Sequence, residues 1–479
     1  MATNARQFVS AALVDARDSL GERLSWLQAR LGDEFPRLPL TLSCDAPVDD
    51  LLGWLAGQTD SPRVYWASRD GGRELAGIGE AFRIDDQDDK DNGGDGDVYG
   101  RIERVLQTCQ DESVQFIGGA TFSGADPDNE SWSAYSRIRH TLPEVLLRRD
   151  GFGTRMTICQ AVSAADSLDP VWSRFCRIID RLDFRRGETD LPLALRCLSR
   201  WDTPDRNGWI KNVEAALTAI QCEQVEKVVL ARRTGLRLDR VVDPVAALAS
   251  LARVNSNCYG FLYEPAPGTA FVSLTPERLF RCHGRAIESE AVSGTAARAA
   301  FASPGIGNGL STADLLDNEK NRREHDFVRQ FVSGKLHGLC DGDVAVTERA
   351  LLRLSNVAHI HSRLTGCLGV DVGLAEVVAS LHPTPAVCGT PPSSAAAIIA
   401  ELEPFARGWY AGPVGICGHD SCELSVAIRS ALIHGDTVEL FVGAGIVRGS
   451  DPQREWRELE VKIAPALRTL AADQQGVKE

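Results

Sequence analysis

The sequence predicts an α+β fold, in which runs of strands are separated by occasional long helices. Strand-like runs such as "EKVVLARRTGLRL" and "TAFVSL" recur, and "LFRCHGRAIE" has a hairpin signal at His283-Gly284. The strict strand–helix alternation of a doubly wound sheet is absent. The chain of 479 residues is long enough for one large mixed domain or about two to four smaller units.

Charge and composition exclude several classes of protein. The formal charge, 52 − 66 = −14, disfavours binding to nucleic acid or to an anionic membrane. The 13 cysteines are scattered without a CxxC pair, as expected for reduced thiols. No apolar run reaches the ~18 residues of a membrane span, and the N-terminus lacks the apolar block of a secretion signal. We therefore expect a cytoplasmic enzyme that concentrates positive charge locally if it binds an anion.

The first 200 residues mix helices and strands, beginning with an amphipathic helix around "VSAALVDARDSLGERLSWLQARL". The insertion "DDQDDKDNGGDGD", from Asp85 to Asp97, has the composition of a calcium loop. Its register does not fit, because with Asp89 first Gly100 stands where the twelfth position needs a bidentate Glu. We expect a solvated, mobile hairpin loop instead.

From about residue 205 the pattern sharpens. A long charged helix is predicted over "TADLLDNEKNRREHDFVRQFVSGKL", and a strand over "VELFVGAGIV" that enters a glycine turn. The last helix should begin at Asp451-Pro452, with Asp as its N-cap and Pro at its first position. The glycines of "GAGIVRG" are spaced one residue too widely for a dinucleotide fingerprint, which disfavours a nucleotide-dependent oxidoreductase.

Carboxylates on two predicted helices are candidate ligands. In the last helix, Glu455, Glu458 and Lys462 share one face at the border of the apolar stripe. They could reach a ligand, or Glu458 and Lys462 could form an ordinary surface pair. Glu324 lies on the core side of its helix, where a carboxylate needs a cation such as Arg323, Lys320 or a metal. Two such glutamates, with waters and an anionic ligand, are typical of a Mg²⁺ site.

Two further residues are candidates for proton transfer. Strand alternation in "VEKVVLARR" places Lys227 on one face with Val225 and Val229. Such a lysine is either an edge residue that reaches solvent or a buried amine able to act as a base. Glu277 lies at a strand end in "SLTPERLF". A carboxylate in this position is often catalytic, but it is also common as an ordinary loop residue. "SGTAAR" adds backbone N–H groups at another tight turn.

Together these segments resemble a known family. The matching segments, in order, are "EKVVLARR", "TPERLF", "VSGTAAR", "EKNRREHDFV", "HPTPAVCGTP", "ELEPFARGWYAGPVG", "VAIRSAL" and "GAGIVRGSDPQREWRELEVK". They resemble the chorismate-utilising enzymes, which include isochorismate, salicylate, anthranilate and aminodeoxychorismate synthases. The resemblance implies a large single chorismate-binding fold of two packed α/β subdomains with mainly antiparallel sheets. Residues 1–200 would be its variable N-terminal half and 205–472 its chorismate-binding catalytic region.

The resemblance also implies roles for individual residues. Lys227 matches the general base that activates water to attack C2 of chorismate, and Glu277 the general acid that protonates the departing C4 hydroxyl. Glu324 and Glu458 match Mg²⁺ ligands that hold the ring carboxylate, with Glu455 orienting metal-bound water. The substrate-binding positions that the family implies are Gly294, Thr295, His359, Tyr410, Arg429, Gly443, Ala444, Gly445 and Lys462. Arg429 and Tyr410 would meet the enolpyruvyl carboxylate, and the glycine turn would let backbone approach a carboxylate.

Within the family the resemblance is greatest to isochorismate synthases. Ammonia users usually have Gln at the position of Lys227, and the segment "HPTPAVCGTP" resembles the isochorismate synthase version. Cys388 and Thr275 replace the usual Gly and Ser of two motifs. A salicylate synthase is the alternative, whereas a noncatalytic chorismate sensor would be expected to have lost Lys227 or Glu277. We expect a monomer or homodimer, whose product serves menaquinone, siderophore or salicylate synthesis.

Overall fold

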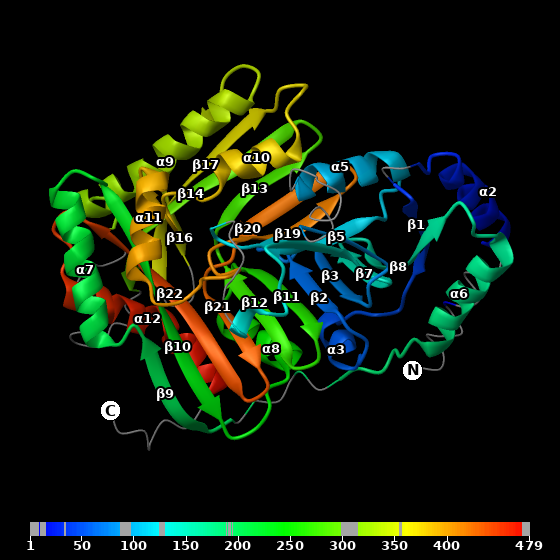
Figure 1. Ribbon diagram of the computed structural model, residues 1–479, viewed down its shortest axis with the longest axis horizontal. Coiled ribbons are helices and arrows are strands. Elements are labelled where there is room, and N and C mark those ends of the chain that lie inside the picture. The colour runs from blue at the N-terminus through cyan, green and yellow to red at the C-terminus, as the bar shows by residue number, and fades with distance from the viewer. Residues whose placement is uncertain are drawn as a thin grey trace.

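The computed structural model consists of two large antiparallel sheets with helices around them (Figure 1). It describes residues 9, 16–32, 35–86, 97–123, 130–187, 189, 193, 195–297, 315–353 and 357–471. Every strand pair among these residues is antiparallel. No described strand of one sheet pairs with a strand of the other. The predicted α+β class and the mainly antiparallel arrangement are confirmed.

The larger sheet has 12 strands and ends beside the candidate site. Its path is β1 (Arg37–Asp45), β8 (Gly153–Ser163), β7 (Val145–Asp150), β3 (Glu74–Ile78), β2 (Arg63–Ala67), β11 (Tyr259–Ala266), β12 (Thr269–Thr275), β21 (Ser430–His434), β22 (Thr437–Val447), β10 (Lys227–Leu238) and β18 (Gly389–Thr390), with β9 (Cys197–Thr203) beside β10. The pairing of β2 with β11 joins the N-terminal strands to the C-terminal ones.

The smaller sheet has 10 strands. Its path is β15 (Ala345–Val346), β17 (Val357–Cys367), β14 (Ala286–Ala297), β13 (Arg278–His283), β20 (Ser421–Val426), β19 (Pro413–Gly418), β5 (Gln115–Ala120), β6 (Ile138–Leu142) and β4 (Phe82–Asp85), with β16 (Ala350–Arg353) beside β17. The predicted hairpin is confirmed, because β13 and β14 turn at Gly284 with φ +53°. Both sheets therefore contain strands from before and after residue 200, and the functional division at that point stays a prediction.

Aromatic side chains fill the space between the two sheets. The aromatic residues in contact with one another there are Trp132, Tyr135, Tyr263, Phe271, Trp409 and Phe441. Thr141 of the smaller sheet and Tyr263 of the larger one lie 2.7 Å apart at their hydroxyl oxygens, so the sheets meet face to face. This packed core holds the strand ends that form the candidate site in fixed positions.

Helices cover the outer surfaces (Figure 1). They are α2 (Arg17–Gln28), α3 (Leu51–Ala56), α5 (Val98–Cys109), α6 (Leu168–Arg181), α7 (Arg206–Gln221), α8 (Pro244–Val254), α9 (Glu319–Leu339), α10 (Leu374–Leu381), α11 (Pro392–Leu402) and α12 (Pro452–Leu470), with a 3₁₀ turn at Glu130–Trp132. α9 packs on β14 and β17, and α12 packs on β22. These two helices bring the candidate carboxylates to neighbouring walls. None of the helices in the described ranges is long and apolar enough to cross a membrane.

Three local predictions have clear outcomes at helix ends. Asp451 caps α12 by accepting from the Arg454 N–H at 2.8 Å, as predicted. The helix predicted from residue 312 begins at Glu319 instead, because the Asn318 side chain accepts from the Asn321 N–H at 3.0 Å and caps it there. α2 lies within the predicted amphipathic segment and buries three leucines.

The acidic insertion is less solvated than predicted at its ends. Asp85 and Asp86 are buried, and Asp85 pairs with Arg83 at 2.9 Å. Asp97 caps α5 by accepting from the Gly100 N–H. Both ends of the insertion are thus part of the packed structure, while residues 87–96 lie outside the described ranges.

Candidate active site

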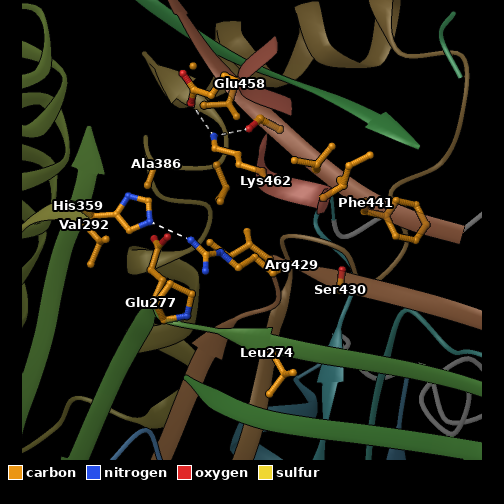
Figure 2. Close-up of a pocket in the computed structure, with 18 of the residues that line it drawn as sticks. Leu274, Glu277, Val292, His359, Ala386, Arg429, Ser430, Phe441, Glu458 and Lys462 are labelled. Atoms are coloured by element: carbon orange, nitrogen blue, oxygen red, sulfur yellow. Dashed lines mark hydrogen bonds and ion pairs between the residues drawn. The ribbon is translucent and has the colours of Figure 1, made fainter. Parts of the chain in front are cut away.

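A cavity at one end of the sheets gathers most of the candidate residues. Its walls come from β10, β14, β17, β22, α9 and α12, and from the connections that follow β12 and precede β21. Its volume is about 140 Å³. A cavity of ~150 Å³ holds a benzene ring, so this one can hold a six-membered ring. Glu277, His359 and Arg429 lie together on one side, and Glu458 and Lys462 face them from above (Figure 2).

Glu277 is a buried carboxyl in the cavity wall. It is the second residue after β12, and its own N–H donates to the Thr275 hydroxyl at 3.2 Å. Only 4% of the residue is exposed. Burial raises the pKa of Glu277 to about 8, with Lys227 opposing the shift and Glu290 adding to it. Glu277 is therefore largely protonated at neutral pH, the state that a proton donor requires.

Lys227 lies directly behind the cavity wall, at the first residue of β10. The side chain is fully buried, and its Nζ is 3.1 Å from Glu324 Oε1 on α9. The side chain is thus buried and does not reach solvent as an edge residue would, whereas its role as a base stays a prediction. Lys227 is also a close partner of Glu324 that the sequence did not suggest. It does not itself line the cavity, whereas Glu324 does.

Arg429 is held by a histidine. Its Nη2 donates to His359 Nε2 at 3.1 Å, and His359 Nδ1 is 3.1 Å from the Gly294 carbonyl oxygen. Since a carbonyl only accepts, Nδ1 carries the proton and Nε2 is left as an acceptor. Burial, followed by the charge of Arg429, lowers the pKa of His359 to about 3, so the ring is neutral. The half-buried Arg429 guanidinium thereby lines the cavity as a fixed positive charge.

The face of α12 carries the remaining charged groups. Lys462 Nζ lies 2.8 Å from Glu458 Oε1 and donates to the Gly443 carbonyl at 2.8 Å. Both side chains also line the cavity, as does the buried Glu455. The sequence analysis treated a Glu458–Lys462 ion pair and a position facing a ligand as alternatives. In the structure, both are present.

The strand predicted over residues 438–447 is confirmed as β22, and Gly443 and Gly445 lie within it, ahead of the turn at Gly449. Both are strand residues of β22, paired with Ala231 and Val229 of β10. Their missing side chains leave room for other groups. A Cβ at Gly443 would lie 2.8 Å from the Tyr410 hydroxyl, and one at Gly445 would lie 2.9 Å from Glu324 Oε1.

Most of the predicted site residues meet at this cavity. Those that line it are Glu277, Gly294, Glu324, His359, Tyr410, Arg429, Gly443, Gly445, Glu455, Glu458 and Lys462. Ala444 does not line it, because strand alternation turns it to the other face of β22. The side chain of Thr295 lies outside the described part of the structure.

Asn321 and Ser430 are two of the lining residues that were not predicted. Asn321 Nδ2 and Ser430 Oγ are buried and have no hydrogen-bond partner among the described residues. Asn321 lies one turn before Glu324 on α9, and Ser430 follows Arg429. In the sequence, only their positions close to Glu324 and Arg429 could have indicated that they belong to the site. Buried polar atoms normally have partners, so these two are suited to contact a polar ligand.

The carboxylates form a donor set for a hard cation. Glu324, Glu455 and Glu458 all line the cavity. No three His, Cys, Asp or Glu side chains in the described ranges are close enough together to hold a metal by themselves. Mg²⁺ is commonly bound through one or two carboxylates, with waters and substrate oxygens completing its shell. The chemistry of this donor set therefore fits Mg²⁺.

Comparisons with known proteins agree on one family. A model of the family described as chorismate binding enzyme matches residues 38–471. Isochorismate synthase MenF of Escherichia coli (strain K12) is 32% identical over 461 residues, 94% of this chain and 99% of its own. Isochorismate synthase 2, chloroplastic, of Arabidopsis thaliana is 30% identical over 88% of this chain and 79% of its own. The structure of MenF, the menaquinone-specific isochorismate synthase from Escherichia coli, has a TM-score of 0.77 at 29% identity, covering 94% of this chain and 100% of that one.

Proposed function

Because the chain belongs to the family of chorismate binding enzymes, we propose that it is an isochorismate synthase, which converts chorismate reversibly into isochorismate. The observation that carries the proposal is the buried carboxyl of Glu277, with its pKa raised to about 8, in one cavity with Arg429 and beside Lys227. The isochorismate synthases described above, which match nearly the full length of this chain, support the same activity.

In the proposed reaction, water adds at C2 of chorismate and the C4 hydroxyl leaves as water. Lys227 accepts a proton from the attacking water, and Glu277 donates one to the departing hydroxyl. The two ring double bonds shift so that the C4–O bond breaks as the C2–O bond forms, and no atoms are gained or lost overall. Positioned acids and bases each contribute typically ~10²–10⁴-fold to such steps.

Positive charge in the cavity is proposed to hold the two carboxylates of the substrate. Arg429, fixed by His359, suits a planar carboxylate because its guanidinium offers a fork of donors. The Tyr410 hydroxyl lies at the same wall, beside Gly443. Lys462 adds a second cation. These groups supply the local positive charge that a chain of formal charge −14 needs to bind a dianion.

Mg²⁺ is proposed as the cofactor. Glu324 and Glu458 would hold it, and Glu455 would orient a bound water. When bound, the ion neutralises the negative charge of the ring carboxylate and helps to orient it. Glu324 Oε1 lies 3.1 Å from Lys227 Nζ, and Glu458 Oε1 lies 2.8 Å from Lys462 Nζ.

The direct test is the product formed from chorismate and Mg²⁺ by purified protein, separated by chromatography without ammonia and then with it. We expect isochorismate in equilibrium with chorismate, no pyruvate, and no dependence on ammonia. Salicylate with pyruvate would show the alternative activity, a salicylate synthase. An aminated product would exclude the proposed function.

Glu324→Gln is expected to raise the Mg²⁺ concentration for half-maximal activity at least about tenfold, because a neutral amide is a weaker ligand for a hard cation. The measurement is the rate of isochorismate formation against Mg²⁺ concentration, together with Mg²⁺ binding followed by calorimetry. Glu319→Gln is the matched control, since Glu319 is exposed in the first turn of the same helix. An unchanged Mg²⁺ affinity would leave Glu324 only as the partner of Lys227.

A further inference from the structure

A second polar network lies beneath Glu277 and begins in the N-terminal part of the chain. Arg69, in the turn between β2 and β3, donates to Glu290 of β14 through two nitrogens, at 2.8 and 2.6 Å. The same guanidinium donates to the Pro276 carbonyl at 2.7 Å. Pro276 immediately precedes Glu277, so Arg69 ties the backbone that carries the buried acid to Glu290.

Glu290 is the centre of the network. Its side chain is 1% exposed, and it also accepts from Arg278 Nη1 at 3.1 Å. His361 Nε2 lies 3.5 Å from its other oxygen. Burial raises the pKa of Glu290, but the contacts with His361 and Arg69 outweigh burial and bring the pKa to about 2. Glu290 is therefore a carboxylate that stays ionised throughout the pH range of an enzyme assay.

The network is anchored on several strands. Arg278, the residue after Glu277, donates through Nε to Glu423 of β20 at 3.0 Å. Glu423 accepts from the Tyr259 hydroxyl at 2.8 Å. The guanidinium carbons of Arg69 and Arg278 lie 5.6 and 5.8 Å from the centre of the Tyr259 ring. Residues on both sides of Glu277 are thus held by buried charge-assisted bonds, which limits movement of the acid.

We propose that Arg69 and Glu290 are positioning residues for the acid Glu277: Arg69 fixes the backbone that precedes it, and Glu290 keeps a permanent negative charge behind it. This inference rests on the proposed function, in which Glu277 donates a proton. This network ends on the backbone segment that bears the acid, whereas the buried pair of Arg63 and Glu264 does not reach that segment.

Several charges surround Glu277, and two of them act on its proton. The titratable and charged groups that share its cavity or act on it are Lys227, Glu290, Glu324, His359, Tyr410, Arg429, Glu455, Glu458 and Lys462. Lys227 favours the ionised form of Glu277, and Glu290 favours the protonated form. Glu290 is the one of these two that is placed away from the reacting atoms, so it can be changed without removing a proposed catalytic group.

The test is the pH dependence of kcat/KM for isochorismate formation in Glu290→Gln. Loss of the negative charge lets Glu277 ionise more readily, so the alkaline limb is expected to move to lower pH by about one unit or more. Glu264→Gln is the matched control. Glu264 forms a buried pair with Arg63 between β2 and β11, outside the cavity, and its loss should leave the alkaline limb in place. A limb that moves equally in both variants, or in neither, overturns the proposal.

Arg69→Lys keeps the positive charge but cannot form the same pair of hydrogen bonds to Glu290. This variant tests the positioning of Glu277 if Glu290→Gln does not fold. We expect kcat to fall about tenfold while the KM for chorismate changes little, because the acid is displaced and the substrate contacts remain. An unchanged kcat contradicts the positioning role. If the wild-type protein forms no isochorismate, the proposed function itself fails, and this inference fails with it.

Discussion

Lys227→Ala is expected to reduce the rate of isochorismate formation by ~10²–10⁴-fold, the range contributed by a positioned base. The buried amine lies 3.1 Å from Glu324, behind the wall formed by Gly445. Removing it leaves the water at C2 without a proton acceptor. Arg429 and Lys462 are untouched, so chorismate binding should weaken much less than kcat falls. Rates at saturating chorismate, with binding measured separately, test this expectation.

Loss of a buried polar side chain also destabilises a protein, and a second variant separates this effect from the loss of catalysis. Arg232 lies on the same strand, is fully buried, and pairs with Glu460 at 2.7 Å outside the cavity. Arg232→Ala should lower the unfolding temperature by removing a buried cation from its network with Glu460 and Asp202. Its folded fraction should keep near-normal turnover. Near-normal turnover in Lys227→Ala would remove this lysine as the base.

Local features were predictable because neighbouring residues determine them. The Asp451-Pro452 start of α12 and the His283-Gly284 hairpin depend on caps and turns of a few residues. The start of α9 shows the limit of this approach. The helix was predicted from residue 312, and only the structure shows that it begins at Glu319, behind the Asn318 cap.

The two glycines of β22 required tertiary contacts to be understood. Glycine weakens an isolated strand, which favours a turn when only the local sequence is considered. In the folded chain, the Tyr410 hydroxyl and the Glu324 carboxylate occupy the space where side chains of Gly443 and Gly445 would stand. Both partners are distant in sequence, so the reason for the glycines is not visible locally.

The contacts between residues within the site could not be predicted from the sequence either. Alternation placed Lys227 with Val225 and Val229, but residues on both faces of β10 are buried, so the pattern could not show which face meets Glu324. His359 and Arg429 are 70 residues apart, and their hydrogen bond follows from how β17 meets the connection before β21. Residue types at the site were predictable from the family resemblance, whereas these partnerships came from the fold.

Glu277→Gln is expected to lower kcat for isochorismate formation by ~10²–10⁴-fold, because an amide of the same shape cannot donate the acidic proton. The same residue should set the alkaline side of the wild-type pH profile. Only the protonated carboxyl can act as the acid, so activity falls as pH rises through the pKa of about 8, by ~10-fold for each further pH unit. The measurement is kcat/KM between about pH 6 and pH 10 for both proteins.

In Glu277→Gln the residual activity should no longer show this alkaline limb, since the group that titrates has been removed. The Thr275 hydroxyl and the Val426 N–H hold the backbone of residue 277 and are unchanged, so the variant should keep its fold and its affinity for chorismate. An alkaline limb that persists near pH 8 would assign the titration to another group. The departing hydroxyl would then have to be protonated by water, and the burial of Glu277 would be left without a catalytic reason.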